Sequence, residues 1–238
     1  MSRQRLTVIG ECLIDAGPDG VRNTPTGDAP TLALAAARAN DSLETCLATA
    51  LGDDPLSDAA ARALDSAGVS TLFVQRLQGE LPALSVRPTE HAEPLVWRNG
   101  TAVRRMFPVH PGYLREIAAG DAVAVTATSL AVLPEGGRKT LTQLLRDVRG
   151  TGNKVALLLN ANPTLWSESE ASREIDRLLG LCSTLFSARR DLEALFGALA
   201  GDAAIDALHA RGVTEVVVWD RGGTLASTGS HRVVRGVP

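Results

Sequence analysis

Short apolar runs alternate with amphipathic helical stretches along most of the sequence, and this alternation restricts the fold more than any other feature. Residues 155–159 (VALLL) form an uninterrupted apolar run, which is typical of a strand buried on both faces. Residues 134–148 place Leu141, Leu144 and Leu145 on one face of a helix. Strands that alternate with helices form a parallel sheet covered by helices on both faces. The pattern therefore predicts an α/β fold with a mostly parallel sheet.

Two acidic residues are expected to begin helices. Asp28 is a good N-cap for a helix over 29–39, and Asp54-Pro55 opens a helix that ends near Gly68. The remaining predicted elements are helices at 134–148, 168–180, 189–197 and 202–211, strands at 6–10, 43–48, 72–74, 121–126, 155–159, 183–186 and 214–219, and a closing hairpin at 225–228 and 232–234.

One region interrupts this alternation. Residues 84–86 and 95–97 are short apolar runs on either side of a polar turn, a pattern typical of two antiparallel strands. Residues 12–24 alternate weakly and could pair with them. We therefore expect a small antiparallel lid made from about 12–24 and 81–98. Ligands of open α/β sheets bind outside the carboxyl ends of the strands, so the candidate site residues follow the strands.

Composition excludes several classes of protein. The 238 residues suit a single domain spanning 1–238, and a net charge of −3 without a long basic run argues against a nucleic-acid partner. No apolar stretch approaches the length of a membrane span. Cys12, Cys46 and Cys182 are far apart, so they predict neither a disulfide framework nor a metal site, and reduced thiols in a cytoplasmic protein are expected.

Several segments carry recognisable motifs in a consistent order. They are residues 8–15 (VIGECLID), 26–30 (TGDAP), 51–55 (LGDDP), 67–70 (AGVS), 97–102 (WRNGTA) and 160–166 (NANPTLW). Together, between residue 7 and about residue 228, they resemble the ribokinase (phosphofructokinase-B, PfkB) family of carbohydrate kinases. The segment 97–102 resembles the lid strand of its 2-keto-3-deoxygluconate kinase branch, and fructokinase is the other close branch.

The resemblance implies a ribokinase-like fold, a Rossmann-like three-layer αβα arrangement, and phosphoryl transfer from ATP with Mg²⁺ to a small sugar or sugar acid. The lid itself predicts a homodimer, because its exposed edge strands could pair across a two-fold axis. The residues that fall at substrate-binding positions are Asp15, Gly27, Asp28, Arg98 and Asn162, and those at nucleotide-binding positions are Asn160 and Gly223.

The chemistry of these side chains leaves alternatives open. The planar guanidinium of Arg98 suits a substrate carboxylate, but Arg98 is equally compatible with an exposed position on an edge strand. Asp15 could bind a sugar hydroxyl, or it could be a solvated residue of a turn. Asp28 is better explained as a helix cap, and Gly27 by close approach of a ligand or by a positive φ.

Departures from the family pattern support a rival hypothesis. Ala188 and Asp191 stand where the family has Asn and Glu in its Asn-x-x-Glu motif, and Asp220 replaces the first glycine of the nucleotide loop. The family's Gly-Ala-Gly-Asp signature would follow Pro238, so the catalytic base is expected beyond that residue and the domain is expected to be short at its C-terminus. The rival is a catalytically inactive homologue that binds a sugar acid or a protein partner.

Two further classes are disfavoured. No Gly-x-Gly-x-x-Gly follows the first predicted strand, which argues against an NAD-dependent enzyme. The segment 136–140 (GGRKT) lacks the spacing of a phosphate loop, and we interpret it as the beginning of a helix.

Overall fold

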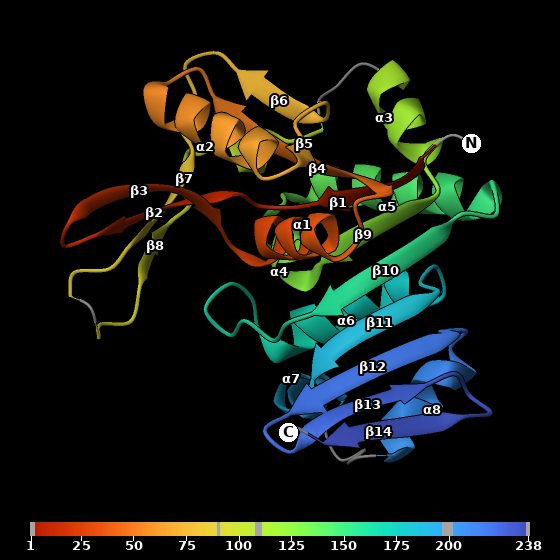
Figure 1. The fold of residues 1–238 in the computed structure, drawn as a ribbon. Coiled ribbons are helices and arrows are strands. Elements are labelled where there is room, and N and C mark those ends of the chain that lie inside the picture. The colour runs from red at the N-terminus through yellow and green to blue at the C-terminus, as the bar shows by residue number, and fades with distance from the viewer. Residues whose placement is uncertain (1–2, 90, 108–110, 197–201, 237–238) are drawn as a thin grey trace.

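The computed structural model describes residues 3–89, 91–107, 111–196 and 202–236. Some positions named in the sequence analysis lie outside these described residues: residue 90 of the predicted lid, residue 197 of a predicted helix, and Pro238. A ten-stranded sheet runs through the described chain (Figure 1), with nine strands in the order β14-β13-β12-β11-β10-β9-β1-β4-β5 and β6 beside β4. Its strands are β1 (Gln4–Ile9), β4 (Leu43–Gly52), β5 (Val69–Ser70), β6 (Val74–Leu77), β9 (Ala122–Thr126), β10 (Lys154–Leu159), β11 (Thr184–Ala188), β12 (Glu215–Asp220), β13 (Gly223–Ser227) and β14 (Arg232–Gly236).

Strand pairing follows the expected pattern. All neighbouring pairs from β12 to β5 are parallel, as is β4 with β6, while β12, β13 and β14 pair antiparallel as the predicted closing hairpin. The predicted α/β fold with a mostly parallel sheet is therefore confirmed.

Helices lie on both faces of the sheet. They are α1 (Asp28–Ala39), α2 (Pro55–Ser66), α3 (Pro111–Ala118), α4 (Ala127–Val132), α5 (Glu135–Gly150), α6 (Glu168–Leu179), α7 (Arg189–Phe196) and α8 (Asp202–Ala210), with a 3₁₀ helix at Ala102–Arg105. One apolar cluster joins α1 and α2 to β1 and β4, and a larger cluster on the other face contains residues of α3 to α8. Val8 faces the first cluster and Ile9 the second, as expected for a strand buried on both sides. None of the helices in the described part is long and apolar enough to cross a membrane.

The far edge of the sheet is covered on one side. Figure 1 shows α7 and α8 behind β11 to β14, and no helix in front of them within the described residues. Trp219 and Val233 are accordingly exposed at this edge.

The predicted lid is present. Strands β2 (Leu13–Gly17), β3 (Gly20–Thr26), β7 (Ala83–Val86) and β8 (Leu95–Trp97) form a second sheet in the order β3-β2-β7-β8. Pairs β2/β3 and β7/β8 are antiparallel, but the central pair β2/β7 is parallel because each of these strands leaves the main sheet in the same direction. Figure 1 shows this sheet projecting from the body of the molecule.

Local signals explain most helix boundaries. The Asp54 carboxylate accepts hydrogen bonds from the backbone N–H groups of Leu56 (2.9 Å) and Ser57 (3.1 Å), which confirms the predicted cap of α2. Asp28 does not cap α1 in this way: the N-cap is Gly27, and no side chain caps the helix. The prediction that Asp28 is an N-cap is therefore wrong, because Asp28 already belongs to the first helical turn.

Candidate functional site

A small cavity lies where the carboxyl ends of β1, β9 and β10 meet the base of the lid. It has a volume of about 110 Å³. We call it the lid cavity, and the residues of its lining used below are Glu11, Gly27, Asp28, Arg98, Asn160 and Asn162. Its position at the carboxyl edge of a parallel sheet is where such folds bind ligands.

Arg98 reaches this cavity from the segment after β8 and pairs with Glu11, which follows β1. The Arg98 Nε–H is 2.9 Å from each of the two carboxylate oxygens of Glu11, and 14% of the Arg98 side chain and 4% of the Glu11 side chain are exposed. Neither Nη group of Arg98 hydrogen-bonds to a residue in the described part of the chain. The guanidinium is therefore held through one nitrogen, with two nitrogens available for a ligand.

Burial raises the pKa of Glu11, and the positive charge and hydrogen bond of Arg98 oppose that rise. The Glu11 backbone N–H donates to Ser129 Oγ at 3.2 Å, and Ser129 Oγ lies 2.6 Å from Thr126 Oγ1. This close packing requires Gly10, where a Cβ atom would lie 2.1 Å from Ser129 Oγ. The backbone that carries Glu11 is thus tightly fixed.

Asp28 also lines the lid cavity. Its Oδ2 atom accepts hydrogen bonds from Thr128 Oγ1 at 2.6 Å and from Asn160 Nδ2 at 3.0 Å. The carboxylate therefore links α1, α4 and the loop after β10. Gly27 has φ +107°, and a Cβ atom added there would lie 3.5 Å from Glu11 O, an ordinary contact, so the positive φ explains this glycine better than a steric restriction does.

Asp15 lies outside the lid cavity. Its Oδ1 atom accepts a hydrogen bond from Ser85 Oγ at 3.1 Å across the lid sheet. Asp15 lines a separate hollow of about 440 Å³ with Arg22 and Arg38. The β2/β3 register shifts between Ile14 and Asp15, so strand alternation alone does not predict the neighbours of Asp15. The structure does not bring Asp15 together with Arg98.

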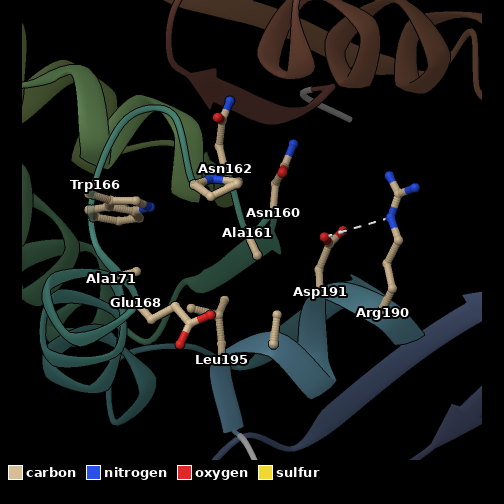
Figure 2. Close-up of a pocket in the computed structure, with 11 residues that line it drawn as sticks. Asn160, Ala161, Asn162, Trp166, Glu168, Ala171, Arg190, Asp191 and Leu195 are labelled. Atoms are coloured by element: carbon tan, nitrogen blue, oxygen red, sulfur yellow. Dashed lines mark ion pairs between the residues drawn. The ribbon is translucent and has the colours of Figure 1, made fainter.

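A second cavity of about 340 Å³ adjoins the first through Asn160 and Asn162, which line both (Figure 2). Asp191, in the first turn of α7, reaches this second cavity, and its neighbour Arg190 places Nε 3.8 Å from Asp191 Oδ1. Burial raises the pKa of Asp191, whereas the charge of Arg190 and a hydrogen bond from the Ala161 backbone lower it.

The turn after β12, where the nucleotide loop is expected, carries an ion pair. Arg189 Nε lies 2.6 Å from Asp220 Oδ2, and Asp220 Oδ1 accepts a hydrogen bond from the Gly222 backbone N–H at 2.7 Å. Arg189 thereby compensates the charge of the unexpected aspartate. Gly223 has φ +147°, and a Cβ there would lie 2.2 Å from Arg235 O, so the approach of β14 accounts for this glycine.

The structure thus brings Gly27, Asp28, Arg98, Asn160 and Asn162 into one cavity and places Asp15 and Gly223 elsewhere. Sequence reasoning missed Glu11 and Thr128. Glu11 is a charged residue that closely follows an apolar strand, a signal that was available. Thr128 lies in the short helix α4, whose six residues are all buried and show no amphipathic period. No group of three or more His, Cys, Asp or Glu side chains within the described ranges is placed to hold a metal ion by itself.

Comparison with known proteins gives consistent results. Residues 3–234 match the family model described as pfkB family carbohydrate kinase. A 2-dehydro-3-deoxygluconokinase of Dickeya dadantii (strain 3937) is 30% identical over 228 residues, which cover 92% of this chain and 74% of that protein.

Solved structures share the fold. The crystal structure of a PfkB protein from Polaromonas sp. JS666 superposes with a TM-score of 0.84 at 15% identity, covering 98% of this chain and 82% of that chain. A ribokinase II structure from Escherichia coli, in complex with ATP and Mg²⁺, gives a TM-score of 0.84 at 13% identity and covers 98% and 78% of the two chains. The ribokinase-like fold predicted from the sequence is thereby confirmed.

Proposed function

The chain belongs to the pfkB family of carbohydrate kinases, and we propose that it transfers a phosphoryl group from ATP to a primary hydroxyl of a small sugar acid resembling 2-keto-3-deoxygluconate. The observation that carries this proposal is the position of Arg98. Its guanidinium lines the lid cavity with both Nη groups unpaired among the described residues, which suits a two-pronged hydrogen bond to a carboxylate. The name of the Dickeya relative supports the same substrate class.

The other residues of the lid cavity have polar groups that suit sugar hydroxyls. Asp28 offers carboxylate oxygens as acceptors, Asn162 offers an amide, and Gly27 stands at the beginning of α1, where backbone N–H groups are free to donate. Asp15 belongs to this proposal only if the lid moves, because it lines a different hollow in the structure.

The second cavity suits the phosphates of a magnesium nucleotide. Mg²⁺ keeps several water molecules and is commonly held by one or two carboxylates together with substrate phosphates. Asp191 is the carboxylate that would serve, with Asn160 beside it at the boundary of the two cavities. Magnesium would neutralise the charge that develops on the transferred phosphoryl group. Gly223 contributes to nucleotide binding in this proposal only through the backbone of its turn.

The test is sugar-dependent release of ADP from Mg-ATP. A panel of sugar acids and matched neutral sugars is incubated with the chain, and we expect ADP release with a six-carbon keto-deoxy acid and much less with fructose. Absence of sugar-dependent ADP release with every compound would exclude the kinase activity of this chain.

The inactive-homologue hypothesis has one specific observation in its favour. Asp220 places a carboxylate in the turn where a nucleotide would approach, and Arg189 is already engaged by it. Thermal shift separates the two hypotheses, since a ligand at 100 times its dissociation constant stabilises a protein by about 2.7 kcal/mol. Stabilisation by a sugar acid without stabilisation by ATP supports the inactive homologue.

A homodimer through the lid is part of this proposal. Val86 faces Leu95 and Leu84 faces Trp97 across the β7/β8 pair, and Leu95 and Trp97 are 66% and 65% exposed. An apolar lid surface of this kind suits a second copy of the chain better than water. A location in the cytoplasm stays a prediction from the sequence.

A further inference from the structure

The lid cavity contains more negative than positive charge. Glu11 and Asp28 are acidic and Arg98 is the one basic residue among the described residues of its lining. Asn162, which also lines the cavity, adds no charge. A substrate carboxylate would therefore enter a small, largely buried space that already has an excess negative charge, and charges interact strongly in such surroundings.

Protonation of Glu11 would remove one negative charge from the lid cavity. Its carboxylate is buried and has one close cationic partner, Arg98, and burial by itself favours its neutral form. The other charges that act on it are Asp28, whose negative charge favours protonation of Glu11, and Arg104, whose positive charge opposes it. The adjacent Cys12 thiol has its pKa raised to about 12 by burial and by the charge of Glu11, so it stays neutral.

Asp28 already has two hydrogen-bond donors. Thr128 Oγ1 and Asn160 Nδ2 both donate to its Oδ2 atom.

We propose that binding of the substrate carboxylate to Arg98 is coupled to the uptake of one proton by Glu11. This inference rests on the proposed function, since it requires an acidic ligand at Arg98. The proton comes from solvent and forms an O–H bond at the Glu11 carboxyl group, while Arg98 keeps all its protons. The positive charge of Arg98, shared with Glu11 in the empty site, is then neutralised by the substrate, and the total charge of the cavity is unchanged.

The coupling has a defined pH dependence. The substrate anion raises the pKa of Glu11 further, because it adds a negative charge and competes for Arg98. Between the pKa of Glu11 in the free protein and the higher pKa in the complex, binding takes up protons. Affinity for the acid therefore falls as pH rises through this interval, by up to about tenfold per pH unit.

Isothermal titration calorimetry tests the coupling directly. The chain is titrated with 2-keto-3-deoxygluconate at about pH 7 in phosphate and in Tris, two buffers with very different protonation enthalpies. We expect the measured enthalpy to depend on the buffer, with a slope whose sign corresponds to net proton uptake on binding. The variant Glu11→Gln is expected to bind the acid with no dependence on the buffer.

A neutral ligand serves as the control. Fructose adds no charge to the lid cavity, and its binding enthalpy is expected to be the same in both buffers. If circular dichroism shows that Glu11→Gln does not fold, the affinity of the unaltered chain for the acid is measured from about pH 6 to 9. This measurement tests the coupling, because proton uptake on binding requires weaker binding at high pH.

The outcomes separate this inference from the proposed function. Binding of the acid with the same enthalpy in both buffers overturns the proton coupling and leaves the kinase proposal intact. Proton uptake that persists in Glu11→Gln overturns the assignment to Glu11. Failure of the unaltered chain to bind any sugar acid overturns the proposed substrate class and the coupling with it.

Discussion

Glu11 and Arg98 connect the main sheet to the lid through a buried ion pair, in which one Arg98 nitrogen contacts both Glu11 carboxylate oxygens at 2.9 Å. Glu11 follows β1 and Arg98 follows β8, so the contact joins residues 87 positions apart. The pair ties the segment after β8 to the main sheet and fixes the orientation of the Arg98 guanidinium.

The first prediction concerns Arg98. Arg98→Lys keeps the positive charge but loses the planar guanidinium that can form two hydrogen bonds to one carboxylate. KM for the sugar acid is therefore expected to rise about tenfold or more, and a tenfold rise corresponds to about 1.4 kcal/mol of binding free energy. KM for ATP is expected to stay within about twofold, because the change is confined to the acid-binding group. Steady-state kinetics with each substrate varied in turn provide the measurement.

Arg105→Lys is the matched control, since Arg105 ends the 3₁₀ helix that follows this segment, is largely exposed and pairs with Glu80 at 2.8 Å. Equal kinetic effects of the two substitutions would contradict a specific role for Arg98.

The second prediction concerns Gly10. A methyl group in Gly10→Ala would lie 2.1 Å from Ser129 Oγ and 2.7 Å from Ala29 Cβ, so we expect a loss of about 1–3 kcal/mol in the free energy of unfolding. Gly136→Ala is the control, because nothing lies within 4 Å of its Cβ position in α5, and it is expected to stabilise the protein by up to about 1 kcal/mol. Urea unfolding measures both, and similar changes in the two variants would refute the close packing around Gly10.

The third prediction concerns the cap of α2. Burial raises the pKa of Asp54, but hydrogen bonds from Ser57 and from backbone N–H groups outweigh it, so the pKa is lowered overall. Asp54→Ala is expected to lose about 1 kcal/mol of stability near neutral pH, whereas Asp54→Asn should retain most of it.

The sign of the pH dependence follows from the lowered pKa. The contribution of the Asp54 charge is complete above the pKa of the unfolded chain and is lost as pH falls through the lower pKa of the folded protein. Urea unfolding at acidic pH should therefore show a smaller difference between the unaltered chain and Asp54→Ala. A difference that grows as the solution is acidified is incompatible with this account.

The fourth prediction concerns the turn after β12. If nucleotide phosphates approach this turn, Asp220→Asn removes a repelling charge and releases Arg189, and ATP affinity is expected to increase about threefold to tenfold. Fluorescence titration with a labelled ATP analogue measures this. Asp176→Asn is the control, because Asp176 of helix α6 forms a comparable exposed pair with Arg211 at 3.1 Å. Unchanged ATP affinity in Asp220→Asn would place the nucleotide elsewhere.

The fifth prediction concerns assembly. Trp97→Lys introduces a charge into the exposed apolar surface of the lid, and a dimer formed there is expected to dissociate, with little change in the stability of the monomer. Val234→Lys, at an exposed position on the edge strand β14, is the control. Light scattering after size exclusion gives the mass of each species, and an unaltered chain that is monomeric at every concentration tested rules out this dimer.

The fold was largely predictable because its elements carry strong local signals. Residues 155–159 are uniformly apolar, and Leu141, Leu144 and Leu145 share one helical face, so β10 and α5 were expected within a few residues of their observed bounds. Helix α4 was missed because its six residues are all buried and show no amphipathic period. The parallel pairing of β2 and β7 depends on chain direction in three dimensions, which strand patterns do not contain.

The site was less predictable because its contacts join distant segments. Asp28 has the residue type of a helix cap, and the structure instead uses it as an acceptor for Thr128 and Asn160, which are 100 and 132 positions away. The charge of Asp220 could be recognised as unfavourable from the sequence, but its compensation by Arg189 depends on the adjacency of β11 and β12. Asp15 could not be placed, because the register shift beside it alters its neighbours.

Phosphorus NMR of the reaction product tests the central claim most directly. The chain is incubated with Mg-ATP and 2-keto-3-deoxygluconate, and the proton-coupled spectrum is recorded as ATP is consumed. The account predicts a new phosphomonoester signal split into a triplet by the two protons of a CH₂ group, increasing in step with ADP. Formation of inorganic phosphate alone, or no consumption of ATP, would contradict phosphoryl transfer to a primary hydroxyl of a sugar acid.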